Sequence, residues 1–197
     1  MNTKISGIVS RIVELERELE QEFAREVEEK RLEFQYLIEK GKIVFGGEAC
    51  ALHKQLRQGV LAFLWEAPVV SLLVSPVIYS LIVPIVLLDF WLWLYQAVCF
   101  PVYGIAKVDR SRYVLLDRRH LQYLNWIERL NCDYCGYANG LIAYVREIAS
   151  RTEQYFCPIK HAHRWSGPHS RYHEFLDFGD ARAYQKELVK FRAELRP

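Results

Sequence analysis

A run of 22 uncharged residues between Glu66 and Asp89 constrains this chain more than any other feature of its sequence. Its length is enough for one crossing of a bilayer, which needs about 20 apolar residues. Apolar residues continue on both sides, and residues 58–106 hold no charge other than these two. A straight helix over residues 59–106 would be roughly 70 Å long, more than twice the ~30 Å hydrocarbon core. The sequence therefore predicts a membrane protein and disfavours one straight crossing.

The prolines in this run predict that it bends. They stand at Pro68, Pro76 and Pro84. Proline removes a backbone donor and kinks a helix, while the neighbouring Ser75 and Ser80 can bond the carbonyls that it frees. We expect a membrane-embedded, re-entrant hairpin of two helices over residues 59–106, bent between Ser75 and Pro84. The alternatives are a single kinked span with an interfacial aromatic helix, and a buried core without a membrane.

The charges around this block predict which side of the membrane its ends occupy. Lys54 and Arg57 precede it, and basic residues from Lys107 to Arg119 follow it. By the positive-inside rule both ends belong in the cytoplasm, which requires an even number of crossings or none that is complete. We expect an inner or plasma membrane protein with both termini cytoplasmic. Asp89 either marks the water boundary of the block or carries a proton or ion, and the same holds for Glu66.

The first 41 residues predict an amphipathic helical arm. Apolar residues fall at 5, 8, 12, 15 and 19 in heptad spacing, and the stripe continues to Ile38 after a shift of phase. This spacing places them on one face of a helix, which we expect to end at Gly41. We expect residues 5–38 to join copies of the protein as a homo-oligomer or to pack on a partner in a membrane complex. The alternative is a helix lying along its own domain, and residues 42–58 form the linker.

The carboxy-terminal part, residues 107–197, is basic, with sixteen Lys and Arg against eleven Asp and Glu. Its apolar residues predict one helix over residues 111–130, a second after Cys135, and a third that Asp180 caps. The expected fold class of the whole chain is therefore all-α. Anionic lipid explains the positive charge beside a membrane segment, so we expect no nucleic acid as a partner.

Four residues of this domain have the types and spacing of a zinc site: Cys132, Cys135, Cys157 and His161. Tetrahedral zinc needs two ligand pairs from separate chain segments, each on a tight turn, and the glycine after the second cysteine favours such a turn. We expect a closed Cys3His site that staples the small helical domain, with iron as the alternative metal. His163 competes with His161 for the fourth position. Ordinary buried thiols are the other interpretation.

The same C-x2-C spacing is also that of a redox dithiol, because the amino terminus of a helix at Cys135 would stabilise its thiolate. Residues 131–140 resemble the thiol motif of the carboxymuconolactone-decarboxylase-like peroxidases, small all-helical proteins with the pattern Cys-x-x-Cys-x-x-x-His on a helix. The resemblance implies a peroxidase dithiol, but Asn139 stands where that family has its histidine. We therefore do not assign the chain to that family.

Residues 160–174 concentrate histidines and basic residues. Those that could contact an anion or a lipid headgroup are Lys160, Arg164, His169, Arg171 and His173. Such side chains donate hydrogen bonds to phosphate oxygens. The alternatives are a second metal site, acid–base catalysis on a phosphoester, and a solvated loop.

The sequence thus favours a membrane-anchored, zinc-stabilised scaffold or accessory subunit that oligomerises or docks a partner complex. We assemble no complete catalytic constellation from it. The rival hypotheses are a dithiol redox or electron-transfer protein that uses Cys132 and Cys135, and a phospholipid-directed enzyme that uses residues 161–173.

Overall fold

The computed structural model describes residues 3–39, 42–163 and 166–197, and most of them are helical. Two compact units form: Met1–Leu64 with Asp117–Leu130, and Trp65–Leu116 with Asn131–Pro197. We call them the first and the second unit. The expected all-α class is confirmed for most of the chain, with one small antiparallel sheet as the exception.

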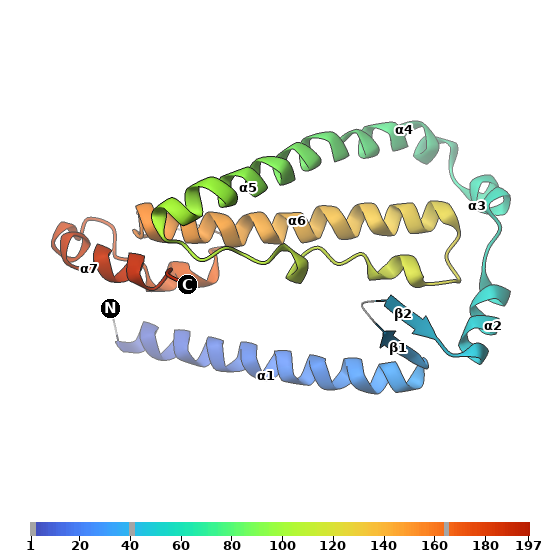
Figure 1. The fold of residues 1–197 in the computed structure, drawn as a ribbon, viewed down its shortest axis with the longest axis horizontal. Coiled ribbons are helices and arrows are strands. Elements are labelled where there is room, and N and C mark those ends of the chain that lie inside the picture. The colour runs from blue at the N-terminus through green and yellow to red at the C-terminus, as the bar shows by residue number, and fades with distance from the viewer. Residues whose placement is uncertain (1–2, 40–41, 164–165) are drawn as a thin grey trace. The chain divides into compact units, whose positions relative to one another are not determined.

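The first unit begins with the long helix α1, Thr3–Glu33, and the hairpin of β1, Tyr36–Glu39, and β2, Lys42–Phe45 (Figure 1). The predicted helical arm therefore ends at Glu33, and the residues after it form strands. Gln35 stops the helix because its φ of 52° lies in the left-handed region. The β-branched and aromatic residues that follow favour strands. Gly41, the expected end of the helix, lies outside the described residues.

Two shorter helices follow the hairpin: α2, Gly47–Leu56, and α3, Val60–Glu66. The chain passes from the first to the second unit within α3. The expected linker over residues 42–58 is thus mostly a strand and a helix. The chain returns to the first unit later, at the short 3-10 helix η2, Asp117–His120.

The apolar block forms one extended helical segment and not a hairpin. Helix α4, Val69–Ser80, and helix α5, Ile82–Tyr103, are separated by Leu81 alone. Leu81 has φ −64° and ψ −15°, which is close to helical, so the chain does not reverse there. The structure therefore has the kinked single segment that was the alternative to the expected hairpin.

Pro76 and Pro84 explain why the segment kinks without breaking. Pro76 cannot donate to the carbonyl of Leu72, and the hydroxyl of Ser75 bonds that oxygen instead, at 2.8 Å. Ser80 likewise donates to the carbonyl of Val77 at 2.7 Å. The expected role is confirmed for Ser75, whereas the carbonyl that Ser80 bonds is not one that a proline frees.

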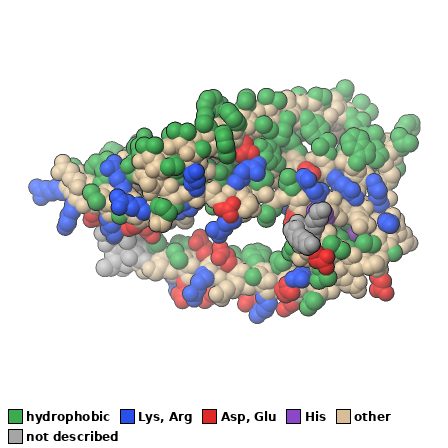
Figure 2. Space-filling view, in the orientation of Figure 1, with side chains coloured by type: hydrophobic (Ala, Val, Ile, Leu, Met, Phe, Trp, Pro, Cys, Tyr) green, Lys and Arg blue, Asp and Glu red, His purple; other side chains and the backbone are tan. Residues whose placement is uncertain are grey.

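Val69–Tyr103 is the one segment of the described residues that is long and apolar enough to cross a membrane. The mean hydropathy of its most apolar 18 residues is 2.4, and none of these 18 residues is buried. Figure 2 shows hydrophobic side chains gathered along the upper edge of the view, over α4 and α5.

Helix α6, Trp126–Phe156, is the other long helix of this part of the chain. Asn125 and Glu128 fix its first turn as a capping box. The side chain of Asn125 accepts from the backbone N–H groups of residues 127 and 128, and Glu128 accepts from the N–H of Asn125 at 2.8 Å. The expected helix over residues 111–130 is wrong in its first part, where the chain forms only the short 3-10 helices η1, Arg110–Arg112, and η2.

The core of the second unit lies where α5 and α6 meet the end of the chain. Its buried apolar side chains are Phe100, Ile105, Val108, Leu141, Tyr144, Ile148 and Leu195. A smaller cluster joins the 3-10 helix η3, Ser170–Glu174, to α7, Ala181–Ala193, through Phe175, Leu176 and Phe191. Asp180 caps α7 by accepting from the N–H of Ala183 at 2.9 Å, as the sequence predicts.

Candidate functional site

Cys132 and Cys135 lie side by side on α6 and not on a turn. Helix α6 starts at Trp126, so both thiols stand within its first three turns. Both are free, Cys132 half-buried and Cys135 exposed. Cys135 does not open the helix, so the stabilisation of its thiolate by a helix amino terminus is not available.

Cys157 and His161 are far from that pair because α6 continues without interruption between them. The N–H of Cys157 still donates to the carbonyl of Glu153, at 2.7 Å. Twenty-two helical positions at 1.5 Å each place Cys157 roughly 33 Å from Cys135 along the helix. The structure thus does not bring together Cys132, Cys135, Cys157 and His161, and His163 lies exposed near the distant end. Within the described ranges no three His, Cys, Asp or Glu side chains gather closely enough to hold a metal.

The glycine after Cys135 has a packing role in this structure. A Cβ on Gly136 would lie 3.3 Å from the carbonyl oxygen of Leu115, and one on Gly140 would collide with the carbonyl of Tyr113. Both glycines face the extended segment that returns beside α6. They therefore allow that backbone to pass close to the helix, which a side chain at Gly140 would prevent and one at Gly136 would crowd.

The basic residues of the 160–174 cluster are held by internal carboxylates. Lys160 pairs with Asp177 at 3.0 Å. The imidazole of His169, which is buried, meets Glu153 at 2.9 Å. These contacts fasten the segment after α6 to the rest of the second unit. His173 is exposed, and Arg164 lies outside the described residues.

Arg171 belongs to a tighter network centred on Glu147. Its two terminal nitrogens donate to the two carboxylate oxygens of Glu147 at 2.8 and 2.9 Å, and Arg151 donates to the same carboxylate at 2.8 Å. Ser150 accepts a further bond from Arg171. Burial acts to raise the pKa of Glu147, but the hydrogen bonds from Arg171 and Arg151 outweigh it, so this pKa lies below its ordinary value.

A cavity of about 320 Å³ adjoins this network. Its charged lining residues are Arg151, Arg171, Glu174, Glu194 and Arg196. Arg151 and Arg171 already share Glu147. Glu147 therefore compensates the charges of two of the three arginines that line the cavity.

Asp89, the charge inside the apolar block, is paired on the face of α5 that is turned toward α6. Arg110 binds its two oxygens at 3.1 and 2.7 Å, and the hydroxyl of Tyr137 donates to it at 2.8 Å. Burial, together with the bond to Asp89, raises the pKa of Tyr137. The structure thus assigns Asp89 a fixed partner, which the sequence alone does not identify because Arg110 lies 21 residues away.

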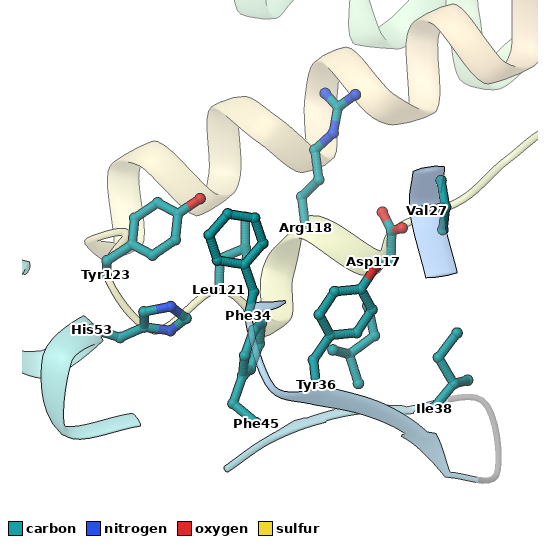
Figure 3. A pocket seen from close by; sticks show the side chains of 11 residues that line it. Val27, Phe34, Tyr36, Ile38, Phe45, His53, Asp117, Arg118, Leu121 and Tyr123 are labelled. Atoms are coloured by element: carbon teal, nitrogen blue, oxygen red, sulfur yellow. The ribbon is translucent and has the colours of Figure 1, made fainter. Parts of the chain in front are cut away.

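An apolar pocket of about 440 Å³ lies within the first unit, between α1, the hairpin and η2 (Figure 3). The ring of His53 stands edge-on to Phe45 and Tyr123, with centroid distances of 4.7 and 5.0 Å. Its Nδ1 is buried and makes no hydrogen bond to any described residue. Sequence patterns do not reveal this pocket, because its lining comes from four separate segments.

Helix α1 carries a second apolar surface. The side chains of its stripe are all exposed: Ile8, Ile12, Leu15, Leu19, Phe23 and Val27. Val27 also lines the pocket, so the stripe leads directly to it. The ion pairs of this helix, such as Arg25 with Glu22, are exposed.

The two long exposed apolar surfaces, on α1 and on α4–α5, and the pocket are thus the features of the described residues that best suit binding. Comparisons with models of protein families, with curated proteins and with solved structures found no match.

Proposed function

We propose that this protein is a membrane-anchored scaffold or accessory subunit that docks a second copy of itself or a partner complex through α1. The observation that carries the proposal is the exposure of the apolar face of α4–α5. On this face the side chains of Leu73 and Val77 are 73% and 69% exposed. Soluble monomers rarely expose apolar patches larger than a few hundred Å².

The docking part of the proposal rests on α1. Its apolar stripe is uncovered over six turns or so, from Ile8 to Val27. A solvated helix with such a stripe gains free energy by packing the stripe on another apolar surface. The apolar pocket at the end of the stripe can accept an apolar side chain of the docked chain. The Nδ1 of His53, which has no hydrogen-bond partner among the described residues, can bond one polar group beside it.

The placement of the membrane anchor follows from charge. Lys107 and Arg112 are exposed directly after α5, and Lys54 and Arg57 are exposed before α3. Basic residues on both flanks favour the cytoplasmic face of an inner or plasma membrane for both ends of the block.

We expect Leu15→Gln combined with Leu19→Gln to reduce the size of the assembly, because both side chains lie at the middle of the stripe. The matched control is Glu14→Gln with Arg17→Gln, which changes exposed residues on the opposite face of the same helix. The measurement is mass photometry of protein extracted from membranes in mild detergent, compared with protein purified alone. Assemblies of unchanged size in both preparations would rule out docking through α1.

Zinc binding remains a prediction of the Cys and His spacing, and one measurement tests it. The spacing predicts about one zinc per chain in protein purified without chelators and loss of that zinc in Cys132→Ser, whereas the separation of the four ligands along α6 predicts no stoichiometric metal. A matched Cys99→Ser variant should keep its metal. A protein without stoichiometric zinc or iron, whose C-x2-C thiols titrate as a reversible disulfide, would instead support the redox hypothesis.

A further inference from the structure

Helices α5 and α6 of the second unit run parallel to each other, side by side. Hydrogen bonds join α4–α5 to α6 at five places along their length. The pairs are Ile78 with Tyr134, Tyr79 with Asn131, Asp89 with Tyr137, Gln96 with Tyr144, and Tyr95 with Thr152. Their sequence separations all fall between 48 and 57 residues, so the two helices keep one register from one end to the other.

The contacts with α6 give α4–α5 two different faces along its length. The half-buried or buried residues recur mostly every three or four positions, and the polar ones among them are Ser75, Tyr79, Asp89, Tyr95 and Gln96. This spacing places them on one helix face, toward α6. The opposite face is apolar and exposed along the entire segment, from Val70 to Val102. At 1.5 Å per residue that face is about 50 Å long, well beyond the ~30 Å hydrocarbon core.

A crossing orientation would carry α6 into the bilayer together with α4–α5. Asp133, Arg146 and Glu147 of α6 would then lie at hydrocarbon depth. A charge at the centre of the bilayer costs roughly 2.5–3.5 kcal/mol on insertion scales.

The returning segment would enter the bilayer as well. Gly136 and Gly140 of α6 lie against the carbonyls of Leu115 and Tyr113, in a stretch without regular secondary structure. Irregular backbone exposed to lipid is not found in the hydrocarbon region, because its polar groups lack partners there.

We propose that α4–α5 does not cross the membrane but lies in its plane, with the face from Val70 to Val102 immersed in one leaflet and α6 on the water side. This inference rests on the membrane attachment proposed above and specifies its geometry. Trp91 and Trp93 are both exposed on α5, and tryptophan favours the headgroup level. Lys107 and Arg112 at its end suit anionic headgroups of the same leaflet.

The immersion depth of single positions along the segment tests this geometry. A nitroxide on a ketone-bearing residue, which leaves the five cysteines intact, is placed in turn at Val70, Val77, Leu87, Val98 and Val102. The full chain is reconstituted in vesicles of phosphatidylcholine with phosphatidylglycerol. Collision rates with oxygen and with a water-soluble nickel complex then report the depth of each label. A label at Arg182 on α7 is the matched control outside the membrane.

We expect the collision rate with oxygen to exceed that with nickel at all five positions, with ratios that agree within about threefold. At Arg182 we expect the collision rate with nickel to be the higher one. A ratio that peaks near Leu87 and falls at both ends would establish a crossing helix and overturn the in-plane geometry, while leaving membrane attachment intact. Labels that collide with neither oxygen nor nickel, and whose spectra are broadened by dipolar coupling between chains, would mean that a second copy of the chain covers this face. That result would overturn the immersion of the face in lipid. Nickel access at all five positions would contradict the attachment itself.

Discussion

Glu147→Gln is expected to lower the free energy of unfolding of the second unit by about 2–4 kcal/mol, because it leaves two arginines without their shared partner in a partly buried site. Arg171 and Arg151 both bind this carboxylate, and a neutral amide cannot accept from both with charge assistance. The measurement is denaturant unfolding in detergent, with hydrogen exchange of residues 166–178 as a local readout. Glu174→Gln is the matched control, since Glu174 is exposed.

The same substitution also changes how stability depends on pH. The folded pKa of Glu147 lies below its ordinary value of 4.5, so its contribution is fully present above pH 4.5 and is lost as the pH falls through the lower folded pKa. Wild-type protein should therefore lose more stability below pH 4.5 than Glu147→Gln does. Equal pH dependence in the two proteins, or faster exchange in the Glu174→Gln control alone, would show that the network does not hold this segment.

Three charges on the exposed face of α4–α5 are expected to release the protein from membranes. The substitutions are Leu73→Glu, Val77→Glu and Leu87→Glu. Each substitution removes a favourable contact with lipid and adds a charge, which costs about 2 kcal/mol or more of the free energy of membrane binding. Together the three should weaken membrane partitioning more than about 100-fold. The measurement is sedimentation with vesicles, and the same distribution in cell fractions.

The matched control places glutamates on the other apolar surface, as Leu15→Glu with Leu19→Glu. Those substitutions should change assembly and leave membrane partitioning within about twofold. Circular dichroism of both variants checks that the helices persist. A triple variant that stays bound to vesicles while remaining helical would contradict the attachment of α4–α5 to lipid.

The sequence predicts those parts of the fold that depend on local pattern. The period of α1, the cap at Asp180 and the hydroxyl of Ser75 that replaces the missing bond of Pro76 are all found, because each depends on residues within one or two helical turns. The hairpin of β1 and β2 is missed, because apolar residues continue at near-helical spacing, after a shift of phase, into residues that pair as strands.

The metal site shows where spacing alone is insufficient. Two ligand pairs 22 residues apart can converge only if the chain turns between them, and the apolar period through Leu141 and Ile148 indicates instead that a helix continues. The capping box at Asn125 and Glu128 is a readable signal of where that helix begins. Taken together, these two signals favour one continuous helix between Cys135 and Cys157.

The pairing of Asp89 and of Glu147 could not be read from the sequence for a different reason. Arg110 and Arg171 reach these carboxylates across 21 and 24 residues, from the short 3-10 helices η1 and η3. Only the Glu147 and Arg151 pair, four residues apart on one helix, has a local signature.

The parallel register of α5 and α6 has a consequence for how the chain is assembled. Contacts between residues about 50 positions apart form late, because the connecting loop must close first. During synthesis α4–α5 leaves the ribosome before α6 exists, with Asp89 and Gln96 unpartnered on one side and apolar residues on the other. A membrane surface can hold that half-finished helix with its polar side toward water until Tyr137 and Tyr144 arrive. The bilayer would then serve this protein as a folding template before it serves as its site of action.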